Sequence, residues 1–430
     1  MVAPDWLRGC LPFYLPVLLC IVSVEVNAES IPHSEIHSDL TVEHHDPIIV
    51  DPTLNLSKLI TLTLEKYPDT LWIKALEEES TALKGRSESL FAGSASAFLA
   101  FQEATSGTLH YVDAAVQVPL WNIGQRQAQE TLAKYAASSA TNQNDAVRLK
   151  VAGLVRTALW DIALADLSYQ QAQAELDMTE QLFAKVKRRV DLGDLPRADS
   201  LLAQTEVLQK RSVVTLAQAE LMHARKRFIS ITQDVKIPSI YQETLCSLKT
   251  IQQNHAALTA IDTLIERKQA ELSTVKLVGS GQTHVAIGIN SDRGNQDPRS
   301  NQTESFNIGV NMPFGGSAHL EPQIAAVNVE LNRLLADREQ LVRSLEQAHH
   351  EAEHNLEVNR VEMQIAEQLK SVAEEHLKMT QLSFSVGEID LIDLLKIQTR
   401  TQQAILNAKQ RAVMLQRDIA FYNQAVGVMP

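Results

Sequence analysis

The stretch that decides the fold runs from Arg126 to Val190 and reads RQAQETLAKYAASSATNQNDAVRLKVAGLVRTALWDIALADLSYQQAQAELDMTEQLFAKVKRRV. It contains no proline, and its one glycine is Gly153. Its apolar or small residues follow one another in steps of three or four, which is a period of about 3.5 residues. They are Val147, Val151, Leu154, Ala158, Ile162, Ala165, Tyr169, Ala172, Leu176, Thr179, Phe183, Val186 and Val190. As one helix, about 65 residues would extend roughly 100 Å, which indicates a coiled coil, a membrane-related rod or a repeat.

The composition favours long helices over a compact aromatic core. Of the 430 residues, 45% are hydrophobic but only 5% are aromatic. The net charge of −13 and the lack of a basic, aromatic-interleaved patch argue against a nucleic-acid partner. The sequence also lacks a nucleophile motif, a phosphate loop and a pair of carboxylates in a pocket motif. We therefore expect no enzyme activity and no cofactor.

The N-terminus has the pattern of a secretory signal peptide over residues 1–28. An apolar run from Leu11 to Val24 follows Arg8, and Val26-Asn27-Ala28 offers a cleavage site. The alternative is a membrane anchor, but the run is shorter than the ~20 residues that a membrane span needs. Residues 29–52 then read as an irregular or extended, histidine-containing periplasmic arm. Cleavage would leave Cys246 as the only cysteine, so no internal disulfide is expected.

The remainder of the chain divides into two similar halves. Pro119 and Pro313 differ by 194 positions, and so do Gly193 and Gly387. A constant offset across two distant landmarks predicts two internal structural repeats. The first predicted part is repeat 1 over 53–235 (strands about 94–120, long helix about 126–190), followed by a connector over 236–247. The second is repeat 2 over 248–430, with a helix over Leu248–Lys276, strands about 283–314 and a long helix about 324–386 without Gly or Pro.

The predicted strands alternate apolar with small or polar residues, which is typical of transmembrane β-strands. A soluble four-stranded sheet with one solvated face would give the same alternation. Four strands cannot close a barrel, and open sheet edges are not viable in lipid, so several copies would have to pool their strands. Three copies would give twelve. The Ala-, Ser-, Gln- and Glu-rich helices fit a hollow helical cylinder, whereas a solid antiparallel bundle would need more leucine.

Four motifs carry a family resemblance. They are VPLWNIG at Val118–Gly124, VDLGDLPRADSLLAQTE at Val190–Glu206, FSVGEIDLIDLLKIQT at Phe384–Thr399 and RDIAFYNQAVG at Arg417–Gly427. The chain resembles the TolC-like outer-membrane efflux proteins (outer membrane factors) over about residues 53–428. The resemblance implies an α+β membrane protein in which a long antiparallel α-helical barrel continues into a transmembrane β-barrel. It implies four strands per chain and twelve per homotrimer.

The resemblance also implies a function. Family members are passive exit ducts of tripartite efflux systems, embedded in outer-membrane lipid of a Gram-negative bacterium with a periplasmic helical tunnel. Their partners are a periplasmic adaptor (membrane fusion) protein and an inner-membrane transporter, here of the resistance-nodulation-division type. The alternatives are the channel of type I protein secretion and a non-channel periplasmic coiled-coil scaffold. Two segments, LWDIALADLSYQQAQ and GDLPRAD, resemble the heavy-metal branch most, so metal ions and small toxic compounds are both candidate substrates.

The resemblance places candidate sites at the two interhelical turns. The expected adaptor-docking tip comprises Leu192, Gly193, Asp194, Val386, Gly387 and Glu388. Among the pore gate candidates, Asp393 matches the first aspartate of the family's constriction, and Lys396 occupies the place of the second. Phe384 occupies the place of a family tyrosine at the tip lock, and Asp390 is a substitute carboxylate. The alternative for Asp393 is a carboxylate that stabilises a helix N-terminus.

Histidines form the only candidate metal ligands. His350 and His354 lie four residues apart, hence on one helix face, beside His349. That spacing permits a metal pair, although no third ligand follows at a motif spacing. The alternative is a set of histidines on a wetted helix wall. The arm carries four more, His33, His37, His44 and His45.

Overall fold

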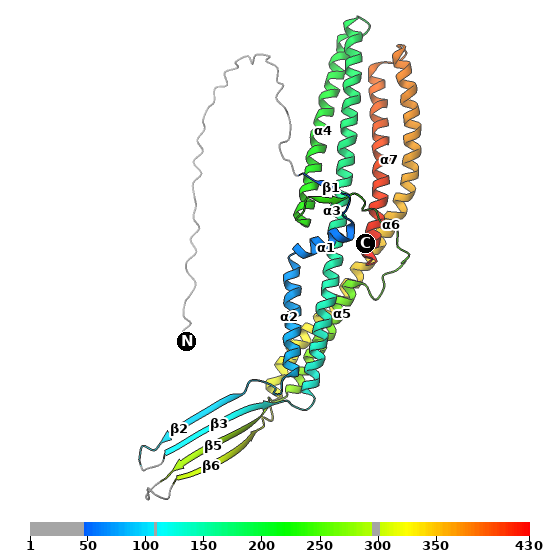
Figure 1. Ribbon diagram of the computed structural model, residues 1–430. Helices are drawn as coiled ribbons and strands as arrows, with labels where there is room; N and C mark the ends of the chain where they lie inside the picture. Colours follow the sequence, from blue (N-terminus) through cyan, green and yellow to red (C-terminus); the bar gives the residue numbers. More distant parts are fainter. Residues whose placement is uncertain (1–46, 107–109, 295–301) are drawn as a thin grey trace, which may run out of the picture. The chain divides into compact units, whose positions relative to one another are not determined.

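The computed structural model of the protein describes residues 47–106, 110–294 and 302–430 (Figure 1). The predicted signal peptide and the arm up to residue 46, including its four histidines, lie outside these residues. In chain order the elements are β1 (Ile49–Asp51), α1 (Leu56–Lys66), α2 (Asp69–Glu88), β2 (Ser96–Glu103), β3 (His110–Leu120), α3 (Gln125–Asp191), α4 (Arg197–Thr232), β4 (Lys236–Pro238), α5 (Ala256–Val278), β5 (Thr283–Arg293), β6 (Gln302–Asn311), α6 (Ser317–Ser385) and α7 (Leu391–Ala425). Two strands, a long helix and a returning helix thus follow one another twice.

The stretch Arg126–Val190 lies in one continuous helix, α3, as its period predicts. Gly124 precedes the helix with a φ of 79°, in the left-handed region that favours glycine. Buried residues recur along it at the predicted steps, among them Val147, Val151 and Ala158. The 3.5-residue period therefore marks the face that α3 buries against its neighbours.

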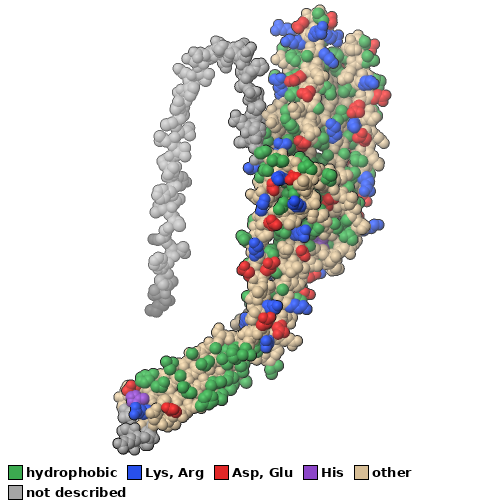
Figure 2. All heavy atoms as spheres, viewed as in Figure 1, with side chains coloured by type: hydrophobic (Ala, Val, Ile, Leu, Met, Phe, Trp, Pro, Cys, Tyr) green, Lys and Arg blue, Asp and Glu red, His purple; other side chains and the backbone are tan. Residues whose placement is uncertain are grey.

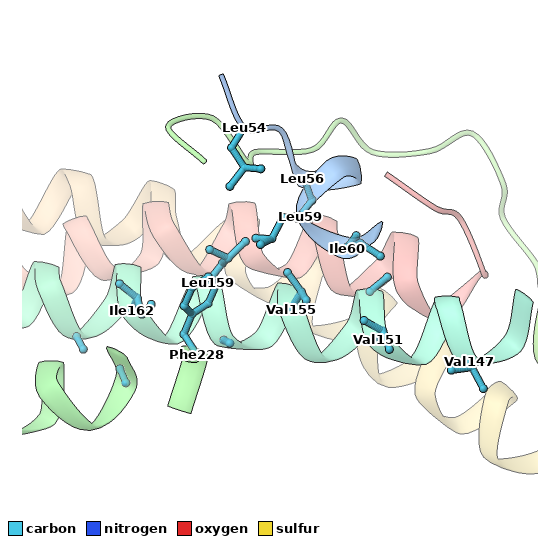
Figure 3. Close-up of a cluster of buried hydrophobic side chains, with 14 of the residues drawn as sticks. Leu54, Leu56, Leu59, Ile60, Val147, Val151, Val155, Leu159, Ile162 and Phe228 are labelled. Carbon is cyan, nitrogen blue, oxygen red and sulfur yellow. The ribbon is translucent and has the colours of Figure 1, made fainter. Parts of the chain in front are cut away.

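The main hydrophobic cluster lies around the middle of α3 (Figure 3). Leu59 and Ile60 of α1 contact the α3 residues Val151 and Val155, and Phe228 of α4 closes the cluster from another side. All five side chains are fully buried. Asn55 starts α1 by accepting a hydrogen bond from the Lys58 amide at 2.8 Å, which directs the apolar face of this short helix onto α3.

The helices pack side by side in two overlapping series. Near the interhelical turns the order is α4, α3, α7, α6, and nearer the strands it is α2, α3, α5, α6. The helix α6 therefore lies at one end of both series, while α4 and α2 lie at the other end. None of the helices in the described residues combines the length and the apolar character needed to cross a membrane.

The four longer strands form one antiparallel sheet in the order β2-β3-β5-β6. The pairing of β3 with β5 joins the two halves of the chain, with Pro119 opposite His284 and Tyr111 opposite Asp292. The outer strands β2 and β6 each pair on one side only. The sheet thus has two unpaired edges within the chain.

Two predicted helix starts are wrong. The helix α6 begins at Ser317, not near Ile324, and includes Pro322. Pro322 cannot donate the backbone hydrogen bond that another residue would donate here, and the helix continues through this position. The helix α5 begins at Ala256, not at Leu248. There the His255 ring accepts a hydrogen bond from the Ala257 amide at 3.2 Å and caps the helix.

The predicted arm and connector are not wholly irregular. Ile49–Asp51 of the arm and Lys236–Pro238 of the connector form a parallel two-stranded sheet, β1 with β4. The two strands lie far apart in the chain and have three residues each. Such short strands show too little alternation of apolar and polar residues to be predicted from the sequence.

Candidate functional site

The sheet has one apolar face. Residues directly opposite each other on neighbouring strands share a face, and the row Leu99, Ala114, Ile289 and Phe306 crosses all four strands. Leu99 is 76% exposed and Phe306 is 65% exposed. Neighbouring rows add Ala97, Val116, Ile287 and Ile308, then Val118, Val285 and Val310. Figure 2 shows hydrophobic side chains gathered over the sheet, and such a patch marks a surface that another apolar phase covers.

The opposite face is polar. The row Ala100, Asp113, Asn290 and Ser305 alternates with the apolar rows along the strands. The next row outward on the same face is Gln102, Tyr111, Asp292 and Thr303. The sheet therefore has one apolar face and one more polar face.

The helices at the ends of the series also leave apolar side chains exposed. On α6 these residues are Val358, Val361, Ile365, Leu369 and Val372, in steps of three or four positions, and Met379 seven positions further on. On α4 they are Leu201, Leu208, Val213 and Leu216, and on α2 they are Leu71 and Trp72. A helix stripe with this spacing is a packing face for another helix. The sequence predicted the long helices, but it did not show that these apolar faces stay exposed in the folded chain.

The two interhelical turns have the same backbone geometry. Gly193 has a φ of 84° and Gly387 a φ of 82°. In the first turn the Asp194 amide donates to the Arg189 carbonyl at 2.8 Å, and in the second the Glu388 amide donates to the Ser383 carbonyl at 2.9 Å. Each turn is thus a helix C-terminus closed by a glycine in the left-handed region.

A second hydrophobic cluster joins the two hairpins next to these turns. It contains Val186 of α3, Ala203 of α4, Leu377 and Phe384 of α6, and Leu391 and Leu394 of α7. Phe384, expected at the gate, is only 8% exposed and packs inside this cluster. Leu192 and Val386, both expected at the docking tip, are exposed beyond it.

Arg189 is a tip residue that sequence reasoning missed. Its guanidinium donates to the Phe384 carbonyl at 3.3 Å and lies 5.3 Å from the centre of the Phe384 ring. This residue of the first hairpin therefore binds the end of α6 in the second hairpin through a hydrogen bond and a cation–π contact. The offset pattern could not identify it, because the equivalent position of the second repeat holds a serine, Ser383.

The predicted gate carboxylates lie at the start of α7. Asp390 caps the helix by accepting a hydrogen bond from the Asp393 amide at 2.8 Å. The Asp393 carboxylate forms an ion pair with Lys396 at 3.1 Å, and both side chains are exposed. These three residues lie three positions apart along the first two turns of α7, and Asp393 also lies where the helix dipole favours a carboxylate.

Both the sequence and the fold were compared with those of known proteins. No protein-family model and no curated protein matches this chain. Solved structures do match. CusC, described as forming a transmembrane channel, has a TM-score of 0.69 at 12% identity, covering 87% of this chain and 92% of its own. The CmeC outer membrane channel of Campylobacter jejuni has a TM-score of 0.67 at 12% identity, with coverages of 86% and 85%.

A third match decides the architecture. The outer membrane protein VceC of Vibrio cholerae has a TM-score of 0.68 at 14% identity, covering 87% of this chain and 97% of its own. The chain has the outer-membrane channel fold. The predicted resemblance to TolC-like proteins is thus confirmed at the level of the fold. Within the outer-membrane channel fold the turns at Gly193 and Gly387 end the two long helices, as the sequence predicts.

A buried charged pair stabilises the middle of this outer-membrane channel fold. The Arg156 guanidinium of α3, only 1% exposed, donates to both oxygens of Glu243 at 2.7 Å. It also donates to the Val428 carbonyl at 3.0 Å and to the Gln424 side chain. The pair therefore ties the segment after β4 and the C-terminal residues to α3. Sequence reasoning missed it, because the partners lie far apart in the chain.

The predicted histidine pair lies on the surface of α6. The rings of His350 and His354 are stacked with centroids 6.3 Å apart and an interplanar angle of 25°. His349 instead packs on Tyr422 of α7, with ring centroids 5.3 Å apart. In the part of the chain that the structure describes, no group of three or more His, Cys, Asp or Glu residues could hold a metal ion.

Proposed function

We propose that the protein is a trimeric outer-membrane exit duct of a tripartite efflux system. One observation carries the proposal. The chain presents a sheet with one apolar face, one polar face and two unpaired edges, continuous with helices whose end members also expose apolar stripes. In an outer membrane of a Gram-negative bacterium, lipid would cover the apolar face.

The sheet edges require partners if the apolar face is in lipid. Unpaired backbone groups at β2 and β6 would cost several kcal/mol each in a bilayer, so the edges must pair between copies. Joining β6 of one copy to β2 of the next repeats around a ring. Three copies close a barrel of twelve strands, a size within the even-numbered range of bacterial barrels.

The helices support the same head-to-tail assembly. The helix α6 ends the series at the side of β6, while α4, α2 and β2 lie at the other side. The apolar stripe of α6 can therefore pack on α4 and α2 of the next copy in the same rotational sense as the strands. A heterologous contact of this kind closes into a ring when the rotation matches the number of copies.

The polar sheet face would then line the pore, and the chain would conduct passively. An inner-membrane transporter of the resistance-nodulation-division type would supply the energy, and a periplasmic adaptor would bind the tip. We propose Leu192, Gly193, Asp194, Val386, Gly387 and Glu388 as the docking tip. Their support is the matching geometry of the two turns and the exposure of Leu192 and Val386.

For the gate we propose Asp393, Asp390 and Lys396, because they cluster at the start of α7. Phe384 is better explained as a packing residue, since it is buried within its own chain. The substrate class is metal ions or small toxic compounds. Type I protein secretion would use the same duct, whereas a soluble coiled-coil scaffold is disfavoured by the exposed apolar sheet face.

Fractionation and planar-bilayer recording test the proposal. We expect detergent-dependent extraction from outer membranes, trimers after crosslinking, and discrete channel openings. Replacing Asp393 by Asn should reduce cation preference, whereas Asp199→Asn at the equivalent position of the first hairpin should not. A protein that is soluble after removal of residues 1–28 would contradict the channel. Channels with unchanged selectivity in Asp393→Asn would remove only that residue from the gate.

A further inference from the structure

Two histidines of α6 form a pair that neither the fold nor the proposed duct explains. His350 and His354 lie on successive turns, and both side chains are exposed. Their rings already lie 6.3 Å apart and nearly parallel, at 25°. Both side chains are exposed within the chain, so their rings can change rotamer at little cost and turn a nitrogen toward one point between them.

Carboxylates flank the pair on the same face. Glu346 precedes His350 by four residues and Glu357 follows His354 by three, which are the spacings of neighbours along one helix face. Both are exposed, and within the described residues neither forms an ion pair. The adjacent His349 differs, because its ring packs on Tyr422. The face therefore offers two imidazoles in the centre and an oxygen donor at each end.

We propose that His350 and His354 chelate one divalent transition-metal ion on the surface of α6. Imidazole nitrogens bind Zn²⁺ at about 2.0–2.1 Å, and two such ligands one turn apart can reach a single ion. Water molecules complete the coordination. The ion joins two turns of the helix.

The chemistry identifies the class of ion. Imidazole suits Zn²⁺, Cu²⁺ and Ni²⁺, while Mg²⁺ and Ca²⁺ prefer oxygen ligands. Among ions of the first row, Cu²⁺ binds nitrogen ligands more tightly than Ni²⁺ or Zn²⁺. The pair should thus bind Ni²⁺ and Zn²⁺, and it should bind Cu²⁺ more tightly. It should show no measurable binding of Mg²⁺ at the same concentration.

Calorimetric titration of the full chain with NiCl₂ tests the site. The variants are His350→Ala, His354→Ala and the double substitution, all at exposed helix positions where alanine is well tolerated. His376→Ala is the matched control, because His376 is also exposed on α6 but has no histidine one turn away. The histidines of residues 29–46 are present in every variant, so their binding cancels in the comparison.

A chelate has a specific signature. Each single substitution should lower the affinity of one binding equivalent at least tenfold, and the double substitution should add little to either one, because losing one ligand already opens the chelate. His376→Ala should bind like the wild type. Equal affinity and stoichiometry in the wild type and the double variant would overturn the site. Additive losses from the two single substitutions would also overturn it, since they indicate independent histidines.

Discussion

Replacing Ile289 by Arg tests whether the apolar sheet face lies in lipid. Ile289 is in β5, between Ala114 of β3 and Phe306 of β6 on the apolar face. Its chain neighbour Asn290 points to the polar face, between Asp113 and Ser305. The matched control is therefore Asn290→Arg, which adds the same charged side chain one residue away on the other face.

The expected cost follows from the position along the strand. The eleven residues of β5 extend about 37 Å at 3.4 Å per residue, and a tilt of about 45° reduces this to roughly 26 Å across the membrane. Ile289 is the seventh residue and lies near the middle. An arginine at the midplane costs about 2–4 kcal/mol, or roughly 30- to 1,000-fold in the folding equilibrium.

A second position on the same face tests the dependence on depth. Val112 lies near the outer end of β3, and its row already contains Ser291 and Glu304. This row is only two residues from that of Ile289, about 5 Å across the membrane at the same tilt. Its carboxylate indicates that it lies nearer the lipid–water interface, so Val112→Arg should cost less than Ile289→Arg. The free energy of unfolding is measured by urea titration in lipid vesicles, with the folded fraction read from gel mobility.

Two results would refute the reasoning. If Ile289→Arg and Asn290→Arg lower the free energy of unfolding equally, the two faces do not differ in environment. If Ile289→Arg and Val112→Arg cost the same, the apolar face is covered by protein and not by a bilayer, because a protein contact has no midplane. The expected order of cost is Ile289→Arg first, then Val112→Arg, then Asn290→Arg.

Three further predictions concern the helical part. Glu243→Ala leaves Arg156 buried without its carboxylate and should lower the free energy of unfolding by about 3–5 kcal/mol in chemical denaturation. Gly387→Ala should cost about 1–2 kcal/mol because φ is 82°, whereas Gly85→Ala, at an open position inside α2, should stabilise by about 0.5–1 kcal/mol. Thermal melts that show the same sign for both glycines would contradict this argument. Burial lowers the pKa of His255, so the unfolded chain binds its proton first and stability should fall as pH decreases below about 6.5. His255→Asn should reduce that loss between pH 7.5 and 5.5, and an unchanged pH dependence would assign it to other groups.

Much of the secondary structure could be predicted because its signals are local. The 3.5-residue period of Arg126–Val190 depends on contacts between successive turns of one helix, and it identified α3 to within one residue at each end. The left-handed glycines Gly193 and Gly387 marked the turns, because other residues adopt that backbone conformation at a cost.

Local signals failed where partners are distant in the chain. The pairing of Ile49–Asp51 with Lys236–Pro238 and the binding of Glu243 by Arg156 depend on how α1, α3 and the C-terminus pack. Nothing in the neighbouring residues specifies such partners. The burial of Phe384 shows the same limit, since it depends on packing against Val186 of α3 and Leu394 of α7.

Short-range residue patterns were enough to predict the long helices, the four strands, the turns that separate them and the alternation of apolar and polar residues along each strand. These depend on backbone conformation and on spacings of two to four residues. Only the tertiary structure decided that β3 pairs with β5, and that β2, β6, α4 and α6 lie at open ends. The physical reason is that an edge exists only after the other strands and helices have found their neighbours.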